Sequence, residues 1–172
     1  MTLTGKEIQA QIDADGGELA RVKDLVPWAK NPRINDIAAK MLAEFISQRG
    51  WGSALLVQRG SNRIIGGHTR LKAAKKLGLD RVPVRYVTCD DRTADALAMA
   101  DNKLGEVAEW NSPGVAEILS QFGLEEAEAM GWDSAALEQL AKDVESFGPL
   151  DSADDETASG ETCPACGRKA AA

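Results

Sequence analysis

Several residue types are scarce in this sequence, and their scarcity narrows the classes of protein to which it can belong. The 172 residues include three cysteines, one histidine and 5% aromatic side chains. Three cysteines are too few for a disulfide framework, and no apolar run approaches the roughly 20 residues that a membrane-spanning helix needs. The first residues also lack the basic-then-apolar order of a secretion signal. We therefore expect a cytoplasmic protein with no membrane contact.

Charge is abundant but unevenly distributed along the chain. The net charge is −7, yet residues 20–86 contain fourteen basic and four acidic side chains, a net charge of +10, which leaves −17 for the remainder. A basic region between acidic flanks is typical of proteins that bind a polyanion such as DNA. The alternative is that the acidic segments only increase solubility or fold back on the basic region.

Hydrophobic periodicity and turn residues predict an α+β fold, in which a small mixed sheet with packed helices is followed by a helical extension and a disordered acidic tail. The expected strands cover residues 21–26, 54–58, 63–66 and 82–87, and the expected helices cover 36–49, 68–77, 92–107, 112–123 and 133–145. The predicted buried faces are Ile37, Met41, Leu42, Phe45 and Ile46 in the first of these helices, and Ala96, Leu97, Ala100 and Leu104 in the third.

These elements divide the chain into five segments. They are an N-terminal extension at 1–19, a compact domain at 20–111, a helical extension at 112–146, an acidic linker at 147–162 and a cysteine-containing tail at 163–172. The first segment is only weakly patterned, although Thr4 and Glu7 have the spacing of a capping box.

The most informative segment runs from Ile64 to Gly78. A short apolar run ends in Gly66 and Gly67, and a basic, alanine-rich helical pattern begins at His68. A strand, a tight turn and a helix N-terminus in this order suit an anion, because free backbone N–H groups and the helix dipole point to one place. The arginine at position 70 adds a guanidinium that can bind phosphate oxygens in pairs. The alternative is an ordinary surface turn.

Five segments, including this turn, resemble motifs of the ParB N-terminal-like domain, in the same order. They are Val22 to Arg33 with its Asn-Pro-Arg loop, Gly50 to Arg59, the turn and helix at Ile65 to Ala74, Leu77 to Val84, and Ala100 to Leu104. The region from about Arg21 to Asn111 is therefore identified as a member of the ParB/sulfiredoxin superfamily, also called the ParB-like nuclease domain. It most resembles stand-alone members found in phages and prophages, which implies a role in the DNA metabolism of a phage or other mobile element.

The resemblance implies a nucleoside triphosphate site, for CTP or ATP, together with Mg²⁺. The residues at the nucleotide-binding positions are Asn31, Arg33, Gly66, Gly67, His68, Thr69 and Arg70. Asp101 and Asn102 are at the positions that hold Mg²⁺, and carboxylate and amide oxygens suit that ion. His68 and Asp101 are the candidate catalytic residues. Sulfiredoxins have a reactive cysteine where this chain has His68, so we do not expect sulfinic-acid repair.

Three functions remain open from the sequence. The first is a nucleotide-gated, DNA-associated protein, and the others are a metal-dependent DNA nuclease and a small-molecule phosphotransferase of the same fold. The helices after residue 111 are too acidic to read DNA, so we expect DNA contact through Lys72, Lys75 and Lys76. A homodimer is a further expectation.

The tail contains a Cys-x-x-Cys-Gly motif formed by Cys163 and Cys166. The motif supplies two thiolates, whereas a closed structural zinc site needs four ligands. A zinc ion shared between two chains, a zinc ion completed by a partner, and an inert tail are the alternatives.

Overall fold

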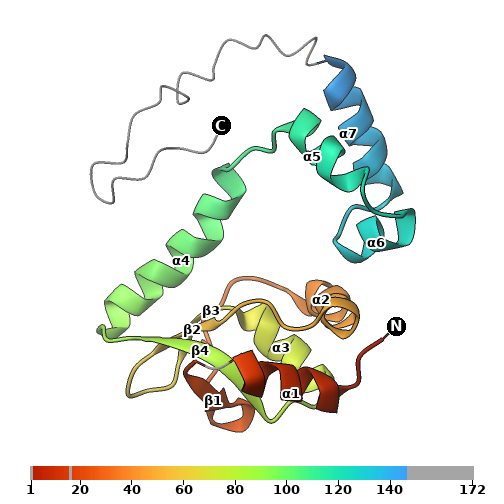
Figure 1. Ribbon diagram of the computed structural model, residues 1–172. Coiled ribbons are helices and arrows are strands. Elements are labelled where there is room, and N and C mark those ends of the chain that lie inside the picture. Colours follow the sequence, from red (N-terminus) through yellow and green to blue (C-terminus); the bar gives the residue numbers. More distant parts are fainter. Residues whose placement is uncertain (1, 16, 147–172) are drawn as a thin grey trace, which may run out of the picture.

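The computed structural model describes residues 2–15 and 17–146 and has the expected mixed α+β architecture (Figure 1). Four strands form one sheet in the order β1-β4-β2-β3. The strands are β1 (Leu19–Arg21), β2 (Leu55–Gln58), β3 (Ile64–Gly66) and β4 (Arg81–Val87). The helices are α1 (Gly5–Asp15), α2 (Asp36–Arg49), α3 (His68–Lys76), α4 (Asp91–Val107), α5 (Ser112–Leu119), α6 (Leu124–Ala129) and α7 (Ser134–Ser146).

The sheet combines antiparallel and parallel pairings. Strands β2 and β3 form the predicted hairpin, β1 pairs antiparallel with β4, and β2 pairs parallel with β4. The parallel pair is possible because α3 connects β3 to β4, as a crossover between parallel strands requires. The strand expected at 21–26 is wrong in its bounds. Strand β1 ends at Arg21 and a short 3₁₀ helix, Val22–Asp24, follows it.

Helices α1, α2 and α3 pack against one face of the sheet around the main hydrophobic core. Ile8 and Ile12 of α1 are almost fully buried in this core. The Thr4–Glu7 capping box is confirmed, because Glu7 accepts hydrogen bonds from Thr4 and Thr4 Oγ1 accepts one from the Glu7 N–H. The Gln9 side chain also accepts from the backbone N–H groups of Asp80 and Arg81, at 3.0 Å each. Although its sequence pattern is weak, the first helix is therefore part of the core.

The other face of the sheet carries a smaller core around Trp28. This indole is 8% exposed and packs with Ile65 of β3 and with Ala94 and Ala98 of α4. The predicted inward face of α4, Ala96, Leu97, Ala100 and Leu104, is wrong, because all four side chains are exposed. On α2, Ile37 and Met41 are likewise exposed, whereas Ile46 is buried as predicted, together with Ala39 and Ala43. Both helices therefore turn toward the protein alanines that lie outside the predicted faces.

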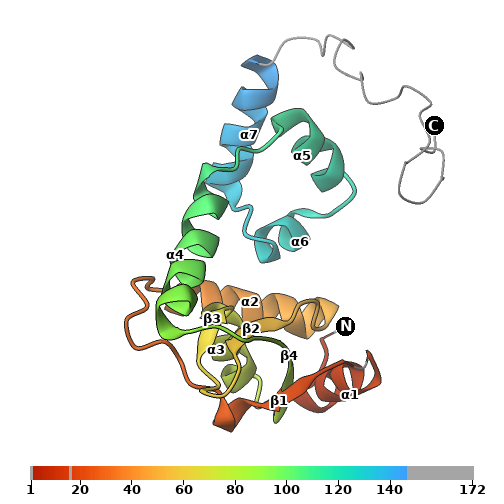
Figure 2. The ribbon, with the colours of Figure 1, turned by 90° about the vertical axis from the view of Figure 1, so that its left-hand side faces the viewer.

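Helix α4 extends away from the sheet and leads to the helical extension (Figure 2). The extension contains α6 in addition to the two predicted helices, and the helix expected at 112–123 ends at Leu119. The indoles of Trp110 and Trp132 meet edge to face with centroids 5.6 Å apart, and an Arg49–Glu126 ion pair connects α2 to α6. Over residues 2–15 and 17–146, no helix is long and apolar enough to cross a membrane.

Two predictions cannot be compared with this structure. The acidic linker and the cysteine tail, with Cys163 and Cys166, lie outside the described residues. The division of the chain at residues 19, 111 and 146 stays a prediction.

Candidate functional site

A cavity of about 320 Å³ lies where the β3–α3 turn meets the Asn-Pro-Arg loop and α4. All nine residues predicted from the sequence to bind nucleotide or magnesium line it: Asn31, Arg33, Gly66, Gly67, His68, Thr69, Arg70, Asp101 and Asn102. The fold therefore gathers residues from three separate segments at one place. The sequence did not predict the remaining lining residues, Ile34, Asn35, Ala38, Leu42 and Ile65.

The floor of the cavity is the glycine turn before α3. Gly67 is the N-cap of α3 and has φ +93°, a left-handed conformation that favours glycine. A Cβ at this position would lie 3.2 Å from Cγ of Leu55, so the backbone also approaches β2 closely. The first intrahelical bond runs from the Leu71 N–H to the Gly67 carbonyl. The backbone N–H groups before Leu71 have no acceptor within the helix, so they can donate to an anion.

Asp101 and Asn102 of α4 face this turn. A Cβ on Gly66 would lie 3.3 Å from Oδ2 of Asp101, so glycine makes room for the carboxylate. The Asn102 amide nitrogen donates to the Ala98 carbonyl at 2.8 Å, which leaves Oδ1 as its possible metal ligand. Within residues 2–15 and 17–146 no group of three His, Cys, Asp or Glu residues could hold a metal ion. One carboxylate and one amide fit Mg²⁺ when phosphate oxygens and waters complete the shell.

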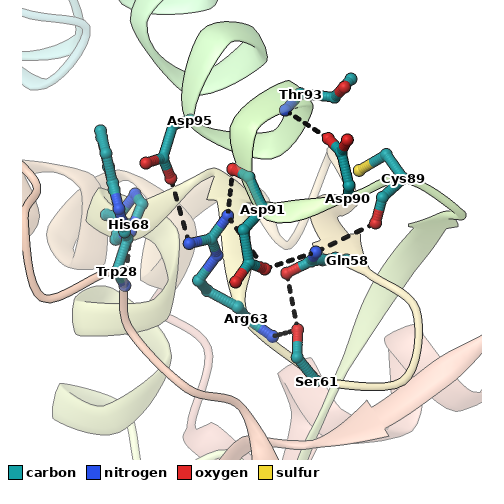
Figure 3. Close-up of polar contacts among 10 residues, drawn as sticks. All are labelled: Trp28, Gln58, Ser61, Arg63, His68, Cys89, Asp90, Asp91, Thr93 and Asp95. Atoms are coloured by element: carbon teal, nitrogen blue, oxygen red, sulfur yellow. Dashed lines mark hydrogen bonds and ion pairs between the residues drawn. The ribbon is translucent and has the colours of Figure 1, made fainter.

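His68 has a structural contact as well as a place in the cavity wall. Its Nε2 accepts a hydrogen bond from the backbone N–H of Trp28 at 3.1 Å (Figure 3). Burial, with a smaller contribution from the nearby Lys72 ammonium, lowers the pKa of His68. The imidazole is therefore neutral near pH 7 with its proton on Nδ1. Because Nε2 is already occupied, the ring is available to a ligand as an N–H donor rather than as a base.

Arg33 connects the Asn-Pro-Arg loop to α4. Its guanidinium forms an ion pair with Glu106 and donates to the Asn102 carbonyl at 3.3 Å. The Asn31 side chain accepts from the Arg33 N–H at 3.3 Å and shapes the loop. Hydrogen bonds from Lys103 and then from Arg33 lower the pKa of Glu106. In contrast, Arg70 has no ion-pair partner in the part of the chain that the structure describes, so its full charge is available to the cavity.

Asn35 is a cavity residue whose role the sequence did not reveal. It occupies the N-cap position of α2, but its side chain makes no capping bond. Its amide nitrogen donates to Oγ1 of Thr69 at 3.1 Å, and the residue is only 8% exposed. Asn35 therefore connects the start of α2 to the first turn of α3. An asparagine before a helix indicates a cap, and nothing local indicates a partner 34 residues away.

A second polar network fixes the start of α4 on the β2–β3 hairpin (Figure 3). The Arg63 guanidinium donates to the Asp91 carbonyl at 3.1 Å and pairs with the Asp95 carboxylate at 3.0 Å. Gln58 donates to the Cys89 carbonyl and to the Asp91 carboxylate, at 3.0 Å each. Because α4 is a rigid rod, this anchor sets where Asp101 lies, about 15 Å further along the helix.

The three lysines predicted to contact DNA are not equivalent. Lys72 forms an ion pair with Asp36 at 2.7 Å. Lys75 and Lys76 are exposed in the last turn of α3, and the structure gives neither an acidic partner. We therefore expect Lys75 and Lys76 to be more available to phosphate than Lys72.

Comparison with known proteins agrees with this architecture. The family model of the ParB N-terminal domain matches residues 9–103. The ParB-like nuclease domain-containing protein YnaK of Escherichia coli (strain K12) is 38% identical over 64 residues, which are 37% of this chain and 72% of that protein. A crystal structure of C-terminally truncated ParB from Caulobacter crescentus, complexed with CTP-γ-S, matches with a TM-score of 0.55 and 20% identity. The match covers 69% of this chain and 72% of the other. This chain belongs to the ParB N-terminal domain family.

Proposed function

We propose that this protein binds a nucleoside triphosphate, CTP or ATP, with Mg²⁺ in the cavity above the β3–α3 turn. The observation that carries the proposal is the convergence of a glycine-rich helix N-terminus, two arginines and an Asp-Asn pair on one cavity of about 320 Å³. This volume suits a small ligand. The family relationship supports the same ligand class, because the ParB of Caulobacter crescentus was crystallised with a CTP analogue.

Different residues of the cavity would bind different parts of the ligand. The first-turn N–H groups of α3 and the Arg70 guanidinium bind phosphate oxygens, and the neutral His68 ring donates from Nδ1. Asp101 and Asn102 would hold Mg²⁺, which neutralises charge on the phosphates when it is bound. Ile34, Ala38 and Leu42 form an apolar wall for the remainder of the ligand.

Calorimetric titration with CTP and ATP, with and without Mg²⁺, tests this proposal. We expect the change Arg70→Ala to weaken binding about tenfold or more, because it removes hydrogen bonds to a charged group. Arg85→Ala is the matched control, since Arg85 is an exposed arginine on β4 that does not line the cavity. The absence of binding to any nucleotide, or equal losses in the two variants, would contradict the proposal.

We further propose that the protein is DNA-associated, acts in the DNA metabolism of a phage or other mobile element, and is cytoplasmic. The net charge of +10 over residues 20–86 supports contact with a polyanion. Exposed apolar side chains, including Ile34, Ile37 and Trp110, support self-association as a homodimer. Light scattering of the purified chain with and without nucleotide measures that association.

Hydrolysis is a separate question from binding. A phosphate-release assay with CTP and ATP shows whether the protein is a nucleoside triphosphatase, and Asp101→Ala should abolish any release that depends on Mg²⁺. The nuclease alternative has less support. Between residues 2 and 146, apart from residue 16, no cluster of three metal-binding side chains exists for a two-metal mechanism.

A further inference from the structure

The side chain of Arg33 is shared between the cavity and an acidic residue outside it. Arg33 lines the cavity, whereas Glu106 does not. The two side chains are about half exposed, at 47% and 49%, and form an ion pair between the Asn-Pro-Arg loop and the last turns of α4. A guanidinium beside a proposed phosphate site is therefore already neutralised by a carboxylate of the same chain.

The ion pair between Arg33 and Glu106 is weak enough for a ligand to break it. An exposed ion pair contributes little to stability, because water screens it and two long side chains must be ordered. A triphosphate carries several charges and presents oxygens that match the guanidinium fork. Glu106 also keeps a partner after Arg33 has left, since Lys103 lies 3.1 Å from its carboxylate. Exchange of Arg33 from Glu106 to a phosphate therefore leaves no charge unpaired.

We propose that Glu106 limits the affinity of the cavity, because it holds Arg33 in the ligand-free protein and competes with the anionic ligand for it. This inference rests on the proposed function. Binding transfers the Arg33 guanidinium from Glu106 to the phosphates and breaks the contact between the Asn-Pro-Arg loop and the end of α4. Glu106 is then an intramolecular competitor that must be displaced before the site reaches its full positive charge.

A purely structural role of Glu106 predicts the opposite result. If the ion pair only positioned Arg33 for the ligand, its removal would weaken binding. If Glu106 competes, its removal strengthens binding. The sign of the change in affinity therefore separates the two roles.

The test measures the dissociation constants of inorganic tripolyphosphate, CTP and ATP by calorimetry at fixed ionic strength. The variant Glu106→Gln keeps the size of the side chain and removes its charge. We expect it to bind about three to ten times more tightly than the wild-type protein, the range expected for loss of one exposed competing charge. Glu109→Gln is the matched control. It removes the same charge from an exposed residue just beyond α4 that the structure gives no basic partner, and its affinity should change less than about twofold.

A double-mutant cycle connects the effect to Arg33. In the Arg33→Ala background, Glu106→Gln should give no more than the control gain, because the contested guanidinium is absent. Unchanged or weaker binding by Glu106→Gln in the wild-type background would overturn the inference and leave the proposed nucleotide site intact. If neither tripolyphosphate nor any nucleotide binds to any variant, the proposed function fails together with it.

Discussion

The Nε2 atom of His68 accepts a hydrogen bond from the backbone N–H of Trp28, which lies 40 residues earlier in the chain, at 3.1 Å. This bond joins the N-terminus of α3 to the loop that carries Asn31 and Arg33. It requires an unprotonated Nε2. The protonation state of His68 therefore determines whether the N-terminus of α3 stays bonded to this loop.

We predict that acid weakens the folded state through His68. Burial first, and the Lys72 charge second, lower its pKa below the ordinary 6.5, so the unfolded chain binds a proton more readily than the folded one. The stabilisation is fully present above pH 6.5 and is lost as the pH falls from there through the lowered folded pKa. Thermal denaturation between pH 7.5 and 5.5 should show a falling melting temperature.

The assignment of this effect is simple because His68 is the only histidine of the chain. In His68→Asn the melting temperature should depend less on pH over the same interval. An equally steep dependence in that variant would show that other groups titrate there.

A second prediction concerns the left-handed glycine of the turn. Gly67→Ala should destabilise the fold by about 2–3 kcal/mol, because it adds a strained backbone conformation and a Cβ 3.2 Å from Leu55. Gly60→Ala is the control. Gly60 has φ +92° but no atom within 4 Å of its Cβ position. Its replacement by alanine should therefore destabilise the fold only through the strained backbone conformation, by about 1–2 kcal/mol. Urea unfolding measures both values, and equal losses would refute the role of the Leu55 contact.

A third prediction concerns the anchor of α4. The Arg63 side chain is only 18% exposed and is bonded to Asp91 and Asp95. Arg63→Ala leaves these partners without their donor and should cost about 2–3 kcal/mol in urea unfolding. Arg59→Ala, on the same hairpin, should cost less than about 1 kcal/mol, because Arg59 is 55% exposed and its ion pair with Glu18 is 3.6 Å long. A smaller loss at Arg63 than at Arg59 would contradict the anchor.

The fourth prediction concerns DNA. Reversal of both exposed α3 lysines, in Lys75→Glu/Lys76→Glu, should weaken binding to duplex DNA roughly tenfold or more. It should also reduce the slope of log K against log salt by about two, one for each lost phosphate contact. Fluorescence anisotropy with a labelled duplex at several salt concentrations measures both quantities.

The control for this experiment carries the same change in net charge elsewhere. Lys6→Glu/Lys142→Glu alters α1 and α7, which are outside the α3 surface. If both double variants lose affinity equally, only net charge matters, and the proposed contact surface is wrong.

Local sequence patterns were sufficient to predict the elements that surround the site. The β2–β3 hairpin, the glycine turn and α3 agree with the structure, because turn residues and a short-range apolar pattern determine them. The motif resemblance then placed Asn31, Arg33, Asp101 and Asn102 beside that turn, and the structure shows all four lining the cavity.

The sequence pattern alone did not predict which side chains of a helix are buried where this depends on the surface against which the helix packs. The sequence pattern predicted Leu97 and Leu104 of α4 as buried, but both are exposed, and Ala94 and Ala98 are buried in the core around Trp28 instead. The weakly patterned α1 became part of the core because the sheet and α2 supply the apolar surface that covers Ile8 and Ile12.

The amino-acid sequence by itself determined the family, the turn and the set of groups suited to phosphate, since each motif is a short run of residues that can be recognised without its neighbours in space. Only the tertiary structure decided which partner each polar side chain has. Asn35 bonds to Thr69 rather than capping α2, His68 uses Nε2 for Trp28, and Arg33 is paired with Glu106. Each of these bonds joins residues at least 34 positions apart, and such a contact forms only when packing of the whole domain brings the two segments together.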